Sequence, residues 1–87
     1  MVRLLIPKIS AEDYSRFRRM CHGLPPTHAE WQFLQRHYHR RDRDNGHEIV
    51  FIAISPTELE DYCKRKVCWP TTDALYCLAN EKAITEA

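Results

Sequence analysis

The stretch Ile49-Val50-Phe51-Ile52-Ala53-Ile54 decides the fold, because it is an uninterrupted apolar run bounded by polar residues. All of its residues except Ala53 are β-branched or aromatic, which are the side chains that strands favour. The run is also far too short to cross a membrane. We therefore predict a strand over 49–54 that forms the centre of a small sheet and is covered on both faces.

The residues after this run carry the signals of a helix start. Ser55 suits the N-cap, Pro56 the first helical position and Glu58 the third, which together form a capping box. The helix that follows is predicted to end before Trp69-Pro70. Its core stripe is predicted to be Leu59, Tyr62, Cys63 and Val67.

A last helix is predicted to begin at Thr72-Asp73, because these residues favour helix N-termini. Leu75, Leu78 and Ala79 then recur on one face and should point inward. We expect this helix to fray by Ala87.

On the N-terminal side, residues 2–6 predict a short strand that Pro7 closes. Ser10 stands three residues before Asp13, as at the start of a capped helix, and Gly23 suits its end. These signals predict a helix over 11–22. Its inward-facing residues are predicted to be Tyr14, Phe17, Met20 and Cys21.

A second helix is predicted to follow Pro25-Pro26, with Thr27 and Glu30 forming its capping box. Trp31, Leu34 and Tyr38 keep one face, and Asn45-Gly46 would end the helix near residue 44. The alternative is a strand over 38–43 joined to the next strand by a type I′ turn at Asn45-Gly46. We favour the helix, because residues 38–43 would have almost nothing to bury as a strand.

These elements predict an α+β fold in the order strand-helix-helix-strand-helix-helix, with a two- or three-stranded sheet covered by about four helices. The 87 residues fit a single domain over 1–87. A hydrophobic fraction of 44% is too high for a disordered tail, and a net charge of +1 creates no general attraction to nucleic acid or membranes. The absence of a signal peptide or membrane span predicts a cytoplasmic protein.

The four cysteines are predicted to be reduced, because no signal sequence indicates an oxidising compartment. Zinc sites usually contain a pair of thiols two to four residues apart, and the chain has no such pair. The best available ligand set is Cys21, His22, Cys68 and Cys77. We predict no metal and no cofactor.

Catalysis is not predicted either. Cys21-His22 and His47-Glu48 are neighbours in sequence, but adjacent side chains on a helix do not face each other. Ser10 and Ser55 are explained as helix caps, and the chain has no glycine-rich phosphate loop. No small-molecule substrate is indicated, so we predict a non-enzymatic protein that binds a partner.

Basic residues suggest nucleic-acid binding as an alternative. The cations gather in three groups, and histidines are interleaved with those of the second group. In a nucleic-acid-binding protein the cations would contact phosphates, and the histidines would stack on bases or donate hydrogen bonds. The competing explanation is that each group lies near a helix C-terminus, where the helix dipole favours cations. The candidate contacts are Arg36, His37, His39, Arg40, Arg41 and Arg43.

Protein binding, with either a partner or a second copy of the chain, is the leading interpretation. Trp31 and Trp69 are large residues near element ends, where partner contacts often lie. The strand at 49–54 has no lysine, proline or glycine to protect an open edge. We therefore predict self-association, with a homodimer as the simplest form.

Overall fold

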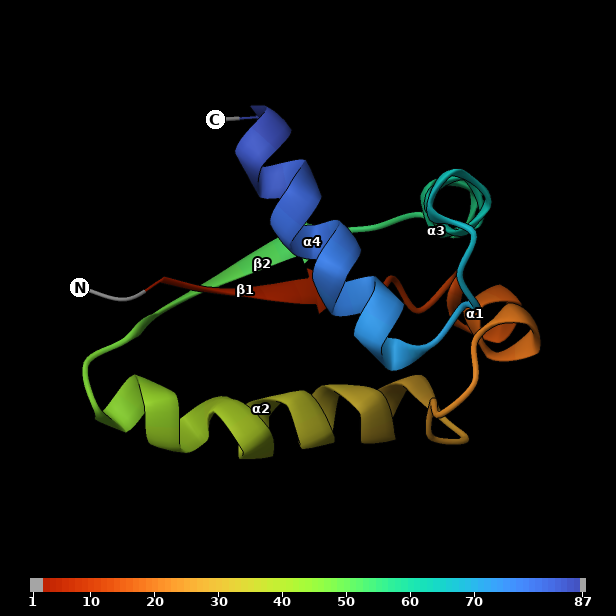
Figure 1. Ribbon diagram of the computed structural model, residues 1–87. Coiled ribbons are helices and arrows are strands. Elements are labelled where there is room, and N and C mark those ends of the chain that lie inside the picture. Colours follow the sequence, from red (N-terminus) through yellow and green to blue (C-terminus); the bar gives the residue numbers. More distant parts are fainter. Residues whose placement is uncertain (1–2, 87) are drawn as a thin grey trace.

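The computed structural model describes residues 3–86 and has the element order β-α-α-β-α-α (Figure 1). This confirms the α+β fold class predicted from the sequence. Val2 and Ala87, to which two of the predictions extended, lie outside the described residues. The elements are β1 (Arg3–Lys8), α1 (Tyr14–Met20), α2 (His28–Asp44), β2 (Glu48–Ala53), α3 (Pro56–Lys66) and α4 (Thr72–Glu86).

The sheet consists of β1 and β2, which pair in parallel from Arg3 opposite Glu48 to Lys8 opposite Ala53. An ion pair of 3.3 Å between Arg3 Nε and Glu48 Oε2 joins the first residues of the two strands. In the described chain β2 therefore has one strand neighbour, and the prediction that it is a central strand is wrong. Residues 38–43 lie within α2, which excludes the alternative third strand and confirms the helix.

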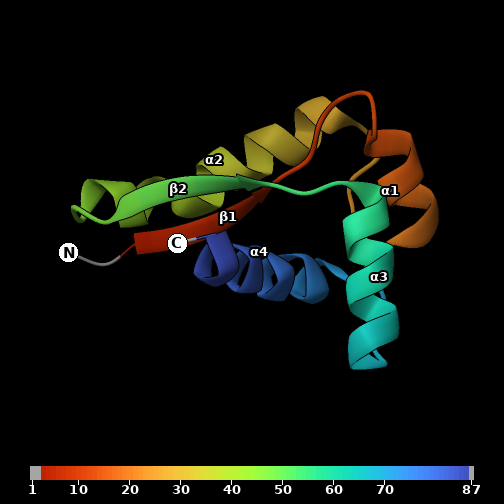
Figure 2. The ribbon, with the colours of Figure 1, turned by 90° about the horizontal axis from the view of Figure 1, so that it is seen from above.

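The helices surround this small sheet on three sides. Figure 2 shows α2 and α4 on opposite faces of the strands, with α1 and α3 beyond the strands' carboxyl ends. The α4 helix packs chiefly on β1 and less on β2. As a result β2 has no fully buried residue, and Phe51 is 55% exposed. A helix therefore lies on each face of this strand, as expected, but the cover is only partial.

The hydrophobic core lies where the helices meet the ends of the strands. Phe17, Leu59 and Leu75, from three different helices, are completely buried. This cluster confirms the predicted inward faces of α1 and α4. Its remaining buried members are Ile9, Tyr14, Cys21, Trp31, Ile54, Tyr62, Cys63, Ala74, Leu78 and Ala79.

Local capping signals fix the start of α3 as predicted. The Ser55 side chain accepts a hydrogen bond from the Glu58 backbone N–H, and the Glu58 carboxylate accepts one from the Ser55 N–H at 2.9 Å. Pro56 occupies the first helical position. The helix ends at Lys66, and Val67 takes a left-handed conformation with φ 53°. Val67 is 91% exposed, so its predicted place in the core stripe is wrong.

The first helix is shorter than the predicted span 11–22. Ser10 Oγ accepts a hydrogen bond from the Asp13 N–H, as the capping pattern requires. This contact stabilises a turn over residues 11–13, however, and regular helix starts only at Tyr14. Cys21 then adopts an extended conformation and ends the helix two residues before Gly23.

The first strand continues through Pro7 instead of ending before it. The register explains this difference. Ile54 N–H donates to the Lys8 carbonyl at 3.1 Å, and backbone groups along a parallel strand alternate between its two sides. Pro7 therefore has its nitrogen on the side away from β2, where the ladder needs no N–H donor.

Candidate functional site

The outer edge of β2 is the most open backbone surface of the sheet. Backbone groups alternate between the two sides of a strand, and the Ile54 N–H points toward β1. The groups of Val50 and Ile52 therefore also point toward β1. Those of Ile49, Phe51 and Ala53 point away from it. Within residues 3–86, the outward N–H and C=O groups of Ile49 and Phe51 have no hydrogen-bond partner. This edge can accept another strand.

One outward group on this edge is occupied. Lys82 Nζ donates to the Ala53 carbonyl at 2.6 Å and forms a 2.7 Å ion pair with Glu58 Oε2. Burial alone would raise the pKa of Glu58, but hydrogen bonds from Lys82 and Ser55 lower it below its usual value. Lys82 thus protects the carboxyl end of β2 and leaves its centre open.

The outer edge of β1 is protected near its carboxyl end. Pro7 has no N–H to offer on that side, and His28 Nε2–H of α2 donates to the Ile9 carbonyl at 2.7 Å. The two strands therefore differ, and in the described chain an added strand finds free donors and acceptors at the centre of β2.

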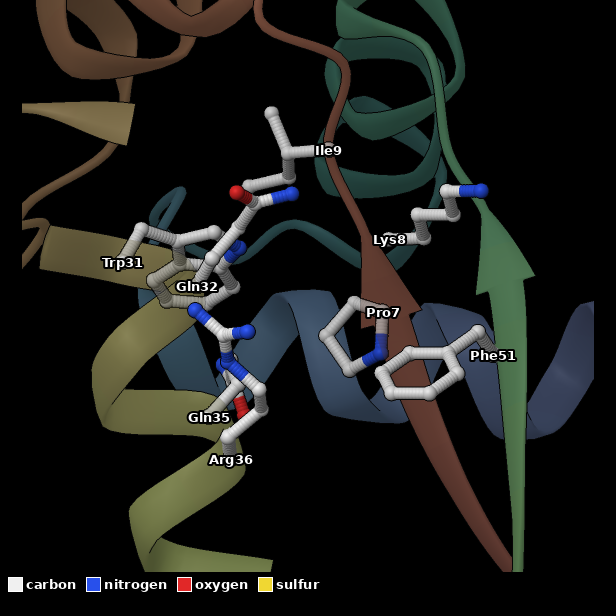
Figure 3. A pocket seen from close by; sticks show the side chains of 8 residues that line it. All are labelled: Pro7, Lys8, Ile9, Trp31, Gln32, Gln35, Arg36 and Phe51. Carbon is white, nitrogen blue, oxygen red and sulfur yellow. The ribbon is translucent and has the colours of Figure 1, made fainter. Parts of the chain in front are cut away.

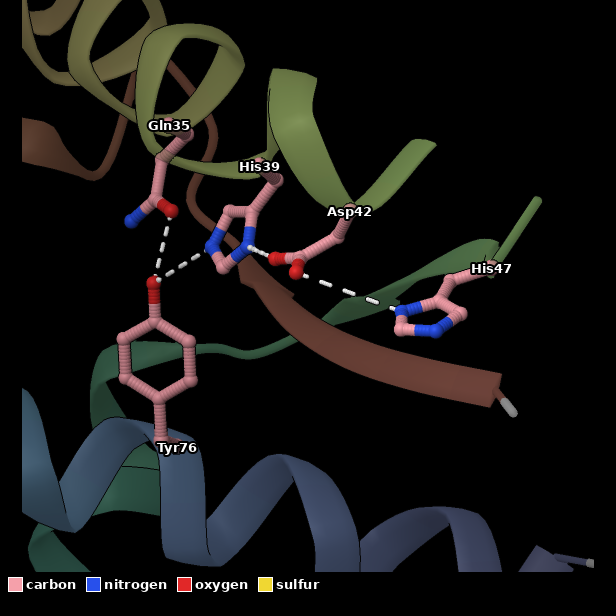
Figure 4. Close-up of polar contacts among 5 residues, drawn as sticks. All are labelled: Gln35, His39, Asp42, His47 and Tyr76. Carbon is pink, nitrogen blue, oxygen red and sulfur yellow. Dashed lines mark hydrogen bonds and ion pairs between the residues drawn. The ribbon is translucent and has the colours of Figure 1, made fainter. Parts of the chain in front are cut away.

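A polar network connects α2 to α4 (Figure 4). The Tyr76 hydroxyl donates to Gln35 Oε1 at 2.7 Å, and His39 Nε2 lies 3.2 Å from the same hydroxyl. Burial raises the pKa of Tyr76, and its hydrogen bond to Gln35 offsets part of that rise. Because Tyr76 uses its only proton on Gln35, His39 must donate from Nε2.

The network continues toward β2 through Asp42. Its carboxylate lies 3.5 Å from His39 Nδ1 and 4.0 Å from His47 Nδ1, and neither of these buried nitrogen atoms has a hydrogen-bond partner among the described residues. The inward position predicted for Tyr38 is wrong, because Tyr38 is 67% exposed and Gln35 is buried instead. The side chain of α4 that faces this part of α2 is Tyr76, and its hydroxyl needs a polar partner.

A cavity of about 260 Å³ lies between α2 and the sheet (Figure 3). Sequence reasoning missed it, because its walls come from three separate segments. The one signal in the sequence was the spacing of Gln32, Gln35 and Arg36, which places them side by side on a helix. The cavity is lined by Pro7, Lys8, Ile9, Trp31, Gln32, Gln35, Arg36 and Phe51.

The two tryptophans lie in different environments. Trp31 is buried at the start of α2 and lines the cavity, whereas Trp69 in the loop between α3 and α4 is 80% exposed. Trp69 is therefore available to a partner, and Trp31 is accessible only through the cavity. Their role in partner binding stays a prediction.

The basic residues do not all act as one group. On α3, Lys64 pairs with Glu60, and Arg65 and Lys66 approach Glu81. On α2, the exposed Arg36, Arg40 and Arg43 recur at helical spacing, but His39 faces Tyr76 instead of solvent. His37 stacks on Phe33, with ring centroids 6.1 Å apart, and Arg41 is exposed. Nucleic-acid binding by these residues stays a prediction.

All four cysteines are free thiols, of which Cys21 and Cys63 are buried and Cys68 and Cys77 exposed. Burial, and to a smaller extent the nearby Cys63, raises the pKa of the Cys21 thiol to about 11. Burial, and to a smaller extent the hydrogen-bonding contact with Cys68, raises the pKa of the Cys63 thiol to about 11. Over residues 3–86, no three His, Cys, Asp or Glu side chains come together as metal ligands, so the set containing Cys21 and His22 is not assembled.

These differences predict selective alkylation. At about pH 8, only about one thiol in a thousand is ionised at a pKa of about 11, and the thiolate is the reactive form. We expect iodoacetamide to modify Cys68 and Cys77 first, as measured by mass spectrometry of peptides. All four should react in denaturant. Equally fast modification of Cys21 in the folded protein would contradict its burial.

Comparison with protein-family models, curated proteins and solved structures finds no match for this chain. Function must therefore be argued from the surfaces described above. None of the helices within residues 3–86 is long and apolar enough to cross a membrane.

Proposed function

We propose that this chain is a small non-enzymatic protein-binding module that takes up an extended strand at the outer edge of β2. The observation that supports this most directly is the pair of residues Ile49 and Phe51, whose outward backbone groups are unpaired in the described chain. Strand addition satisfies such groups with main-chain hydrogen bonds. Pro7, which lacks an N–H, makes the outer edge of β1 the poorer acceptor of a strand.

A second copy of the chain is the occupant that this edge fits best. Two β2 strands related by a twofold axis at Phe51 would run antiparallel and place Ile49 of each copy opposite Ala53 of the other. The residues that pair across the two strands are then Ile49, Phe51 and Ala53 in both copies. All of them are apolar, so no like charges face each other. Lys82 would have to release the Ala53 carbonyl, which limits the affinity.

Phe51→Pro tests this proposal, because proline removes the outward N–H while the hydrogen bonds to β1 use the neighbouring residues. Phe51→Val is the matched control, since it shortens the side chain but keeps the donor. We expect sedimentation equilibrium to show the wild type and Phe51→Val associating above 10.4 kDa as concentration rises. Phe51→Pro should associate at least about tenfold more weakly.

Circular dichroism must first show that Phe51→Pro keeps its helices. A wild-type chain that stays at 10.4 kDa up to millimolar concentration would overturn self-association as the mode of binding. Equal association of the proline and valine variants would show that the copies meet at another surface.

A further inference from the structure

The cavity between α2 and the sheet combines an apolar lining with positive charge. Pro7, Ile9, Trp31 and Phe51 supply its apolar surface. Figure 3 shows Gln35 and Arg36 on α2 facing Pro7 and Phe51 of the sheet. Ligand sites typically have such mostly apolar walls with a few convergent polar groups.

The charged groups of the cavity are all of one sign. Lys8 and Arg36 line it, and no aspartate or glutamate does. Within residues 3–86, neither cation forms an ion pair, whereas Lys64, Arg65 and Lys82 do. Figure 3 shows Lys8 pointing toward the end of β2 and away from Arg36, so Arg36 is the uncompensated cation that a ligand between α2 and the sheet would meet. Arginine suits a carboxylate because it can bind both oxygens.

A side-chain amide in the wall of the cavity adds a second indication. Gln35 lines the cavity and is only 7% exposed. Its Oε1 accepts from Tyr76, but its Nε2 donor has no partner among the described residues. Within residues 3–86, the fully buried side-chain atoms left without a partner belong to His39 and His47, so Gln35 Nε2 meets solvent in the cavity. A ligand oxygen in the cavity would satisfy this donor.

We propose that this cavity binds a small organic carboxylate with an apolar body. The carboxylate pairs with Arg36 and accepts from Gln35 Nε2, and the apolar body packs between Trp31, Pro7 and Phe51. A volume of about 260 Å³ corresponds to about nine water volumes, so the ligand is close to the size of 3-phenylpropionate. The cavity uses the side chain of Phe51 and not the backbone groups of the β2 edge, so binding there does not depend on strand addition.

Trp31 fluorescence provides the readout. The Trp69→Phe chain, in which Trp31 is the only tryptophan, is titrated with 3-phenylpropionate and with the uncharged 3-phenyl-1-propanol. We expect the carboxylate to change the emission with a Kd of about a millimolar, and to bind about tenfold more tightly than the alcohol. Raising the salt concentration should weaken the binding of the carboxylate but not that of the alcohol.

Arg36→Gln in the same background should abolish the preference for the carboxylate. Arg40→Gln is the matched control, because it removes the same charge from an exposed position on the same helix outside the cavity lining. Preference kept in Arg40→Gln and lost in Arg36→Gln supports the site. Equal binding of acid and alcohol by the wild type, equal effects of the two variants, or no change in Trp31 emission would each overturn it.

Discussion

Replacing Phe17 with alanine is expected to destabilise the fold by about 3–5 kcal/mol. Phe17 is completely buried at the centre of the core, where α1 meets the helices that follow the strands. A chain of 87 residues has a total stability of only about 4 to 13 kcal/mol. Removing this one ring therefore takes away a large fraction of that stability.

Urea denaturation followed by circular dichroism measures this loss. Phe33→Ala is the matched control, since Phe33 is 62% exposed on α2 and contacts His37 at the surface. Its free energy of unfolding should stay within about 0.5 kcal/mol of the wild type. Similar midpoints for Phe17→Ala and the wild type would mean that Phe17 is not a core residue.

Helix starts could be predicted from the sequence because their causes are local. The Ser55-Pro56-Glu58 pattern acts over one helical turn, and the structure shows both of its hydrogen bonds. Thr27 likewise accepts from the Glu30 N–H, as the sequence indicated. Asn45 and Gly46 end α2 by donating to the carbonyl groups of Arg41 and Arg43, and Gly46 has φ 85°.

The errors arose where a residue's environment is set by distant parts of the chain. Pro7 continues β1 because its nitrogen is on the edge away from β2, which its neighbours in sequence do not reveal. Gln35 is buried because Tyr76, 41 positions away, supplies its partner. Hydrophobic periodicity assigns such a face to Tyr38, since it cannot anticipate a buried hydrogen bond.

The candidate sites were predictable to different degrees. The open edge at 49–54 was inferred from the lack of protecting residues, and the structure adds which backbone groups point outward and that Lys82 occupies one of them. The cavity was not predicted, because its lining combines residues 7–9, 31–36 and 51. No periodic pattern connects these segments before the chain folds.

Replacing Tyr76 with phenylalanine should cost about 1–3 kcal/mol, although it removes a single oxygen atom. The hydroxyl serves both Gln35 and His39, and without it Gln35 Oε1 stays buried with no donor. The loss in the free energy of unfolding is measured by urea denaturation. Tyr38→Phe, which removes the same atom from an exposed side chain on α2, should change stability by less than about 0.5 kcal/mol.

A double-mutant cycle separates the lost hydrogen bond from general disturbance of α4. Gln35→Met replaces the amide with an unbranched apolar side chain, so that no buried acceptor is left unsatisfied. We therefore expect Gln35→Met to be far less harmful in the Tyr76→Phe background than in the wild type, with a coupling energy of about 0.5–3 kcal/mol. Additive losses would show that the two side chains act independently. In that case α2 and α4 would be held together by apolar packing, and the Gln35 carbonyl would find its donor in water.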